Sequence, residues 1–245
     1  MLGIKRKERQ KFPVTVESVS DVTPHMRRFR VAGDALRTLE LDEPAQWMKV
    51  FVPCSGDQSR VGRAYTVRNF DPSHGRMDLD FVLHGDTGPA SRWAAHAWPG
   101  EQIIIAGPGK GYPVDPTVRH HLLIGDATSL PAIAAILEVL PETAEAIVFA
   151  EVATPEEEQP FMSRASVECT WLHSGKEWPG TTGRLELAVQ NVALPLDDCS
   201  VWVAGESLMV RSLRSWFLVD QRLSRSQLHA KGYWKLGVAD HRDRD

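Results

Sequence analysis

The sequence predicts an antiparallel six-stranded β-barrel followed by an α/β domain with a parallel sheet. Short runs rich in Val, Ile, Phe and Tyr recur through the first half, and Gly, Pro, Asp and Ser separate them. From His121 onward, apolar runs alternate with a segment of helical length, which is typical of a parallel sheet with right-handed crossovers. Residues 107–115 between the two halves are rich in Gly and Pro, so we place the boundary there and expect domains 1–112 and 113–245.

The composition suits a folded chain. Its 245 residues are 42% apolar and 24% charged, close to the globular average, which excludes disorder and a coiled coil. The net charge of −4 argues against a general nucleic-acid binder. No apolar stretch approaches the roughly 20 residues that cross a bilayer, and the first residues lack the apolar core of a secretory signal. We therefore expect no membrane span and a cytoplasmic location.

Six strands and one helix are expected in the first half. Each strand combines β-branched or aromatic residues with a turn sequence at its end. The predicted strands are Phe12–Val19, Met26–Ala32, Trp47–Val52, Arg63–Phe70, Met77–Leu83 and Gln102–Ala106. A short helix is expected near Ser91–Ala97. Six strands at this spacing are typical of a small barrel.

Four strands and two helices are expected in the second half. Continuous apolar runs indicate strands that are buried on both faces, as parallel sheets require. These strands are Leu122–Ile124, Ala146–Ala150, Val167–Leu172 and Val201–Ala204. Leu130–Leu140 has the length and spacing of a helix, and Glu206–Leu223 is expected to form one long amphipathic helix.

Three groups of residues that often carry chemistry are interpreted as structural. The three cysteines, which include no Cys-x-x-Cys pair, are expected to be small apolar core residues: Cys54, Cys169 and Cys199. The basic residues of segment 5–11 are expected to be solvated, with the edge of an anionic site as the alternative. His120-His121 lacks metal-ligand spacing, and no metal site is predicted.

The most informative stretch is Arg63-Ala64-Tyr65-Thr66, in the fourth barrel strand. A flavin needs a cation for its pyrophosphate, an aromatic ring for its isoalloxazine and a hydroxyl or backbone donor near N5. Because side chains alternate along a strand, Arg63 and Tyr65 would share one face. Taken alone, the tetrapeptide is equally typical of an ordinary half-exposed strand.

Two junctions between a strand and a helix have the chemistry of phosphate sites. Residues 84–91 bring free N–H groups, small residues and a capping hydroxyl to a helix start, although a capped helix without a ligand is the alternative. Residues 125–132 open the first helix of the second half, where Gly125 permits a tight turn and Thr128 and Ser129 can cap. The pattern Gly-x-Gly-x-x-Gly is missing there, which favours transient nicotinamide binding.

Five motifs in order are far more specific than any one of them. They are RAYTVR, DFVLHGDTGPASRWA, LLIGDATSLPAI, VWVAGE before an Arg-rich helix, and the closing GYWKLG. Together with VTPHMRRFRVAG and WMKVFVP they resemble the siderophore-interacting protein family of flavin-dependent ferric-siderophore reductases, which are ferredoxin-reductase-like. The similarity runs from about Val14 to Gly237. It implies an FAD-binding barrel joined to a domain for NADPH or NADH, with hydride passing to FAD and electrons passing singly to iron in a siderophore.

The resemblance also implies roles for individual residues. The flavin and its phosphates would contact Arg63, Tyr65 and Thr66, with Tyr65 packed on the ring. The adenosine diphosphate part would contact His84, Thr87, Gly88, Ala90 and Ser91. The nicotinamide side would comprise Gly125, Asp126, Thr128, Ser129, Gly205 and Glu206. Trp234 would pack near the flavin, with a core tryptophan in a terminal strand as the alternative.

The substrate would be recognised by cations. Many ferric siderophores are anionic, so lysines near the flavin edge would attract and orient one. The candidates are Lys49, Lys231 and Lys235, each of which is also typical of a solvated surface. Glu156-Glu157-Glu158 lies where a nicotinamide ribose is expected and is interpreted as a solvated loop. The 2′-phosphate of NADPH would need an arginine or lysine there, and Arg164 is the nearest basic residue downstream. The choice between NADH and NADPH stays open.

Two other functions are compatible with the same features. One is a siderophore-binding flavoprotein that receives electrons from a ferredoxin instead of a nicotinamide. The other is a general flavin reductase with a different acceptor. A ferric-siderophore reductase agrees best with the motifs, because the flavin carries the chemistry and no Ser-His-Asp or paired-carboxylate arrangement is present in the sequence.

Overall fold

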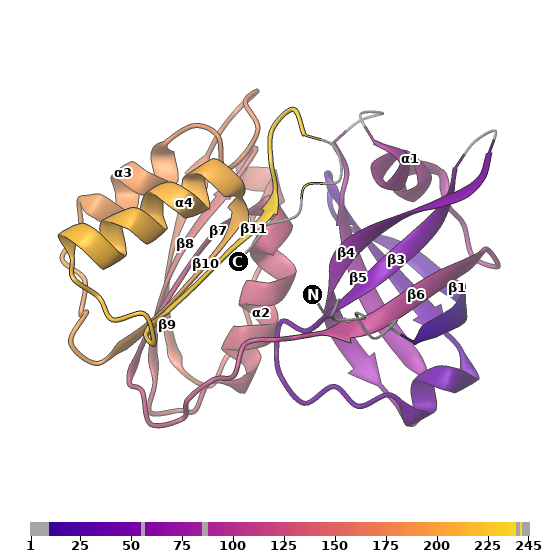
Figure 1. Ribbon diagram of the computed structural model, residues 1–245, viewed down its shortest axis with the longest axis horizontal. Helices are drawn as coiled ribbons and strands as arrows, with labels where there is room; N and C mark the ends of the chain where they lie inside the picture. The colour runs from indigo at the N-terminus through magenta and orange to yellow at the C-terminus, as the bar shows by residue number, and fades with distance from the viewer. Residues whose placement is uncertain (1–9, 55–56, 85–87, 239–240, 242–245) are drawn as a thin grey trace, which may run out of the picture.

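The first six strands close into an antiparallel barrel in the computed structural model, which describes residues 10–54, 57–84, 88–238 and 241 (Figure 1). Around the barrel the order is β1-β2-β5-β4-β3-β6. The strands are β1 (Lys11–Thr23), β2 (Met26–Ala32), β3 (Trp47–Cys54), β4 (Asp57–Asp71), β5 (Arg76–Val82) and β6 (Gln102–Gly109). The predicted barrel is confirmed. Strands β1 and β4 are longer than predicted, because their ladders continue past the apolar runs into polar residues.

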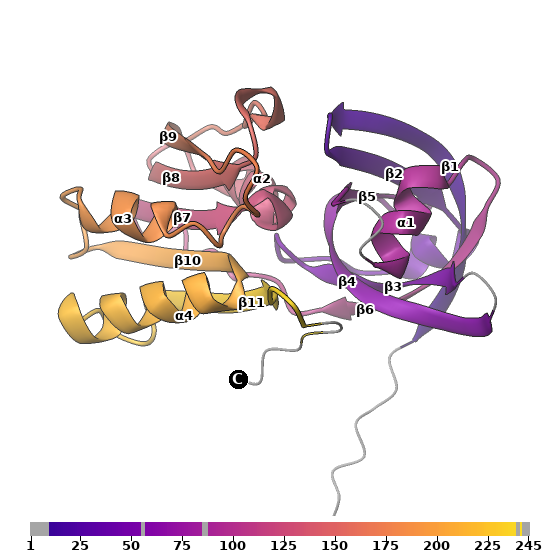
Figure 2. The ribbon, with the colours of Figure 1, turned by 90° about the horizontal axis from the view of Figure 1, so that it is seen from above.

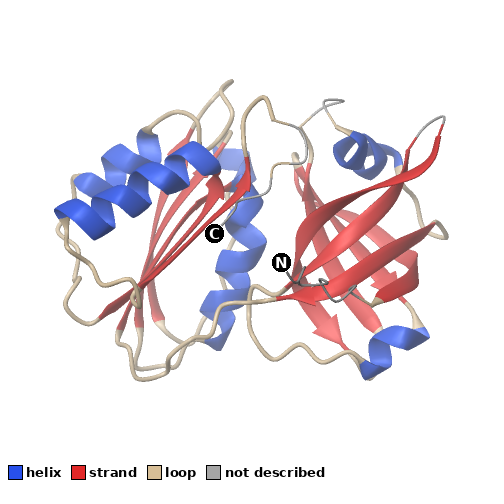
Figure 3. Ribbon diagram, in the orientation of Figure 1, coloured by secondary structure: helices blue, strands red, loops and turns tan. Residues whose placement is uncertain are grey.

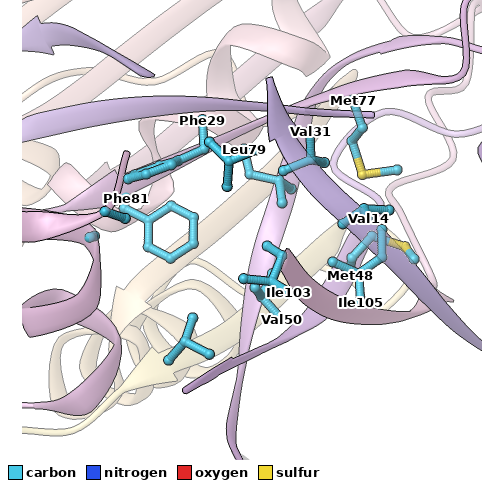
Figure 4. Packing of buried hydrophobic residues seen from close by; sticks show 14 of the residues in the cluster. Val14, Phe29, Val31, Met48, Val50, Met77, Leu79, Phe81, Ile103 and Ile105 are labelled. Carbon is cyan, nitrogen blue, oxygen red and sulfur yellow. The ribbon is translucent and has the colours of Figure 1, made fainter. Parts of the chain in front are cut away.

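Alternate residues of these strands fill the barrel. Figure 4 shows side chains from five strands pointing toward one another, among them Phe29, Leu79, Met48 and Ile105. Seen from above in Figure 2, helix α1 (Pro89–His96) lies over the opening of the barrel. Its Trp93 stacks on Phe29 with ring centroids 4.9 Å apart. The helix that carries the 84–91 segment is therefore fixed to the barrel core.

The second half forms a five-stranded parallel sheet with the order β11-β10-β7-β8-β9. The strands are β7 (His120–Asp126), β8 (Glu145–Val152), β9 (Ser166–His173), β10 (Cys199–Glu206) and β11 (Leu228–Trp234). Helix α2 (Leu130–Val139) lies between the sheet and the barrel, whereas α3 (Arg184–Gln190) and α4 (Ser207–Ser215) cover the other face, as the blue helices of Figure 3 show. The predicted parallel α/β domain is confirmed.

The predicted helix Glu206–Leu223 is wrong in its bounds. Helix α4 begins after Glu206, which is its N-cap, and ends at Ser215. A π-helical turn, η4 (Trp216–Asp220), follows, in which the Gln221 amide donates to the Trp216 carbonyl five residues back at 3.0 Å. This wider turn interrupts the α-helical spacing. Helix α3 was not predicted, and strand β11 was foreseen only as the terminal strand in the alternative for Trp234; each has only seven residues, too few for a clear periodic pattern.

Three short 3₁₀ turns complete the elements: η1 (Asp34–Thr38), η2 (Ala127–Ser129) and η3 (Pro155–Glu157). Of the cysteines, Cys199 is buried and Cys169 is half-buried against the apolar core, and burial raises their pKa values to about 11 and about 12. Their thiols are therefore neutral packing groups, whereas the Cys54 side chain lies outside the described residues. No helix in the described ranges is long and apolar enough to span a bilayer.

Candidate functional site

The strand order changes direction between β7 and β10, and α/β sheets usually bind their ligands outside the carboxyl ends of the strands at such a point. Gly125 and Ala204 lie opposite each other in register, so both strands end together. Helix α2 leaves β7 toward the barrel, and α4 leaves β10 on the opposite face. The fold therefore brings residues 125–126 and 205–206 to one edge of the sheet.

Asp126 is the centre of this edge. Its carboxylate is 0% exposed and accepts four hydrogen bonds. Oδ1 accepts from the Thr128 amide at 2.9 Å and from the Thr128 hydroxyl at 2.6 Å. Oδ2 accepts from the Glu206 amide at 2.7 Å and from the Trp234 indole at 2.9 Å. Burial raises the pKa of Asp126 to about 6, and these hydrogen bonds limit the rise. The side chain thus joins the ends of β7, β10 and β11.

Two glycines allow this close packing. A Cβ on Gly205 would lie 2.5 Å from Asp126 Oδ2, and the φ of +140° at Gly205 disfavours any other residue. A Cβ on Gly125 would overlap the Ser129 hydroxyl. That hydroxyl donates to the Asp126 carbonyl at 2.7 Å. Ser129 occupies the N-cap position of α2, but its hydroxyl caps no amide of that helix. Asp126 caps the preceding 3₁₀ turn, accepting from the Thr128 amide.

Glu206 is also used within the protein. Its buried carboxylate accepts from the amides of Leu208 at 2.5 Å and Met209 at 3.2 Å, which caps α4. The other oxygen accepts from the Leu236 amide at 3.2 Å. Glu206 therefore fastens the segment after β11 to the start of α4. That segment, yellow in Figure 1, crosses from the sheet toward the barrel.

Trp234 ends β11 at the same edge. Its indole donates to Asp126, and its carbonyl accepts from the Ser207 hydroxyl at 2.9 Å. The side chain is half-buried, so the alternative of a core tryptophan does not describe it. These two hydrogen bonds hold Trp234 in place at the carboxyl edge of the sheet.

The strand motif of the barrel has the alternation that the sequence predicts. Arg63 and Tyr65 pair with Val50 and Met48, and Thr66 projects from the opposite face of β4. The Tyr65 ring stacks on Phe81 with centroids 3.7 Å apart, and burial raises the pKa of its phenol. The phenol is therefore neutral at any physiological pH.

Thr66 connects the two domains. Its side chain lies beside the Tyr233 hydroxyl of β11, where it opposes the rise that burial causes in the pKa of that phenol. Near by, the Arg68 guanidinium binds the Glu138 carboxylate of α2 with N–O distances of 2.6 and 3.1 Å. Tyr233 was not among the predicted site residues, because no local pattern indicates a contact over such a distance in sequence.

His84 and residues 88–91 of the predicted phosphate segment lie close together at the start of α1. The His84 amide donates to the Ser91 hydroxyl at 3.1 Å, which ties the two ends together. Gly88 is the N-cap of α1 without a side-chain cap, and Ala90 is buried beneath it. A Cβ on Gly88 would meet only the His84 ring, at 3.9 Å. Thr87 lies outside the described residues.

The predicted lysines are partly brought together. Lys49 and Trp47 lie two residues apart on one face of β3, and the Lys231 ammonium from β11 lies 5.4 Å from the Trp47 ring centroid. Lys49 lies 5.5 Å from the Phe51 ring. Lys11 joins them from β1, 6.0 Å from the same ring, because Lys11 and Lys49 both pair with Ala106 of β6. Lys11 is exposed, as expected, and its place beside Lys49 agrees with the alternative that it lies at the edge of an anionic site. No contact links Lys235 to this group in the described residues.

The acidic run is not simply a solvated loop. Glu156 and Glu158 are exposed as expected, but Glu157 is buried. Its Oε2 accepts from the Thr23 hydroxyl at 2.5 Å, and its Oε1 lies 2.7 Å from His25 Nδ1. Both partners belong to the β1–β2 turn of the barrel. Glu157 therefore holds the α/β domain against the barrel, which the sequence did not indicate.

The chain matches two family models in tandem. Residues 15–61 and 54–112 match the siderophore-interacting FAD-binding domain, and residues 118–237 match the siderophore-interacting protein model. The ferric vibriobactin reductase ViuB of Vibrio cholerae serotype O1 is 30% identical over 235 residues, which cover 88% of this chain and 86% of ViuB.

Solved structures agree with these matches. A siderophore utilization protein from T. fusca superposes with a TM-score of 0.88 at 31% identity and covers 97% of both chains. The siderophore-interacting protein SipS from Aeromonas hydrophila superposes with a TM-score of 0.78 at 29% identity, covering 94% of this chain and all of SipS. The motifs, the barrel with its adjoining parallel sheet and these matches agree, and the chain belongs to the siderophore-interacting protein family.

Proposed function

We propose that the protein is a flavin-dependent oxidoreductase that takes electrons from NADH or NADPH and passes them through FAD to ferric iron in a siderophore. One observation carries the proposal: the barrel strand with Arg63, Tyr65 and Thr66 meets the α/β domain, because Arg68 of the same strand binds Glu138 of α2 and Thr66 lies beside Tyr233 of β11. A flavin and a nicotinamide held at these two places would meet. We assign the FAD domain to residues 1–112 and the nicotinamide domain to residues 113–245, which the separate family models support.

The residues on the barrel side fit FAD. Arg63 is a half-buried cation, and Tyr65 offers an uncharged ring held by Phe81. The start of α1 has glycine at its N-cap, and backbone amides at a helix start favour an anion. We assign the pyrophosphate to Arg63 and the start of α1, and the isoalloxazine to Tyr65 and Thr66. His84, Thr87, Gly88, Ala90 and Ser91 would surround the adenosine diphosphate part.

On the sheet side, we assign the nicotinamide dinucleotide to the carboxyl edge between β7 and β10, where the strand order reverses. Thr128 is half-buried at this edge. Asp126, Ser129 and Glu206 would act indirectly, since their side chains bond within the protein and shape the edge.

FAD, when bound, supplies the redox chemistry, because a flavin accepts a hydride and releases electrons one at a time. The chain binds and orients both partners and excludes water from between them. Ferric iron is held tightly by hard oxygen ligands and ferrous iron weakly, so reduction amounts to release of the metal. Dependence on NADH or NADPH supports a cytoplasmic location, where these donors are available.

The lysines supply the attraction for an anionic substrate. We propose that Lys49 and Lys231 bind the ferric siderophore together with Lys11, and that Lys235 extends this group. The overall charge of −4 makes a local cationic surface necessary for such a ligand.

Anaerobic stopped-flow mixing tests the proposal. The FAD-loaded protein is mixed with NADH or with NADPH, and we expect rapid bleaching of the flavin absorbance near 450 nm, followed by reoxidation on addition of a ferric siderophore and capture of ferrous iron by a chelator. Bleaching only with a reduced ferredoxin would show the ferredoxin-dependent alternative. Reoxidation by other acceptors but not by any ferric siderophore would show a general flavin reductase.

A further inference from the structure

The loop between β9 and α3, residues 174–183, presents a large aromatic side chain at the domain junction. Trp178 is 40% exposed, although tryptophan is usually much more buried. The loop is nevertheless firmly built. The Trp178 carbonyl accepts from the Thr181 amide at 3.1 Å and from the Thr181 hydroxyl at 2.7 Å, so a tight turn fixes the backbone that carries the ring.

A buried carboxylate anchors this loop to the sheet. Glu151, at the end of β8, is 0% exposed. It accepts from the Gly180 amide at 2.6 Å and from the Thr182 hydroxyl. Burial raises the pKa of Glu151, and both hydrogen bonds oppose that rise. The loop is therefore fastened two and four residues after Trp178, at the carboxyl edge of the sheet.

The same loop packs against the carboxyl ends of β7 and β10. Gly180 has a φ of +84°, and a Cβ there would lie 2.6 Å from Asp126 Oδ2 and 3.1 Å from Glu206 Cβ. Only glycine allows this approach. Trp178 thus stands beside the edge to which we assign the nicotinamide dinucleotide.

On its other side Trp178 reaches the barrel. Its ring lies 5.8 Å from the His84 ring, centroid to centroid, at an interplanar angle of 74°. The His84 amide donates to the Ser91 hydroxyl of α1, so His84 is tied to the start of that helix. The exposed indole therefore lies between the proposed sites of the adenosine diphosphate part of FAD and of the nicotinamide dinucleotide.

We propose that Trp178 is a stacking surface for the adenine ring of a bound dinucleotide, an inference that rests on the proposed function. A planar, uncharged base suits an exposed indole, since stacking needs a π-face and no charge. The isoalloxazine already has Tyr65 as its partner. Adenine occurs in both FAD and NAD(P)H. The contact with His84 favours the adenine of FAD, and the position beside Asp126 allows that of the nicotinamide donor.

The test compares Trp178→Ala with Trp178→Phe in the full chain, freed of flavin and titrated with FAD and with FMN. Stacking of one base on an aromatic side chain is worth about 5- to 150-fold in affinity. We expect Trp178→Ala to raise the Kd for FAD by that factor and to leave the Kd for FMN unchanged. Trp178→Phe should raise the Kd for FAD less, because phenylalanine keeps an aromatic ring. FMN contains the flavin and one phosphate but no adenine. The loop's hydrogen bonds use the backbone of residue 178, so the fold should persist.

Trp98→Ala is the matched control, because Trp98 is 66% exposed at the far end of α1 and the same substitution there should change neither Kd. If FAD and FMN binding are unchanged but the Kd for NADH, measured with the FAD-loaded protein, rises, the stacked adenine is that of the donor. Equal weakening of FAD and FMN, or no change with any of the three ligands, would overturn the proposal. Failure of wild-type protein to bind FAD at all would instead refute the proposed function.

Discussion

Replacing Trp234 with Phe tests whether Asp126 organises the carboxyl edge. Phenylalanine keeps an aromatic ring at the end of β11 but removes the indole N–H that donates to Asp126 Oδ2 at 2.9 Å. The buried carboxylate then keeps three of its four donors, two from Thr128 and one from Glu206. No water replaces the lost donor easily, because Asp126 is fully buried.

The loss should be measurable as stability. A hydrogen bond to a charged group contributes about 1.5–3 kcal/mol. For a chain of this length, each kcal/mol lowers Tm by about 2–4 °C, so we expect a decrease of about 3–12 °C at pH 8. The smaller ring adds a cost that does not depend on pH.

The pH dependence distinguishes the two contributions. Burial raises the pKa of Asp126 to about 6 in the folded protein, and the lost hydrogen bond favoured the charged form, so this pKa is higher in the variant. A carboxyl whose folded pKa lies above its unfolded value holds its proton more tightly when folded. Stability therefore falls as pH rises between the two values, and in the variant this fall continues to higher pH. The difference in Tm between the two proteins should grow from about pH 5 to about pH 8.

Thermal unfolding followed by circular dichroism at both pH values measures this difference. Trp93→Phe is the control, since its indole donates to Glu101 at 2.8 Å but Glu101 is only half-buried. Its decrease in Tm should be the same at both pH values. A Trp234→Phe decrease that is also independent of pH would show that the indole does not support the charge on Asp126.

Three further results are expected from the described contacts. Arg63→Ala should raise the Kd for FAD about 10- to 150-fold, because a charge-assisted phosphate contact is worth about 1.5–3 kcal/mol. Tyr65→Phe should change this Kd little, because phenylalanine keeps the stacking ring. Fluorescence titration measures both values, and equal effects of the two variants would contradict the assignment. Charge reversal at Lys49 or Lys231 should raise the apparent KM for an anionic ferric siderophore but not for a small neutral acceptor, and added salt should reduce the effect, because exposed charges are screened over about 8–10 Å; a KM insensitive to charge and salt would exclude a cationic surface. Glu157→Ala should lower the free energy of urea unfolding by about 2–4 kcal/mol, because it leaves the buried Thr23 hydroxyl without the carboxylate that accepts its hydrogen bond. The control variant Glu156→Ala, at an exposed position, should leave this free energy unchanged.

Local patterns predicted much of this fold, because they depend on residues close in sequence. Apolar runs and turn residues indicated the six barrel strands, and the alternation in β4 placed Arg63 and Tyr65 on one face. The end of α4 was not predictable in this way. The sequence after Ser215 keeps an amphipathic pattern, and only the hydrogen bonds of the folded chain show that it continues as a π-helical turn.

Contacts between distant residues were beyond local patterns. Trp234 and Asp126 are 108 residues apart, and Thr23 and Glu157 are 134 apart. Lys11 joins Lys49 only because β6, from much later in the chain, lies between β1 and β3. Motif resemblance did identify Asp126 and Glu206 as important positions. It could not reveal that their carboxylates bond within the protein.

The carboxyl edge of the sheet is built on buried acids. Asp126, Glu151 and Glu206 end three neighbouring parallel strands, and each fastens a segment at this edge. Their negative charge opposes tight retention of a pyrophosphate there. The proposed donor would leave after each hydride transfer and needs no tight retention, whereas a resident flavin would. Arg63 and the start of α1 lie on the barrel instead, which supports the proposed division between a barrel that retains FAD and a sheet from which the donor leaves.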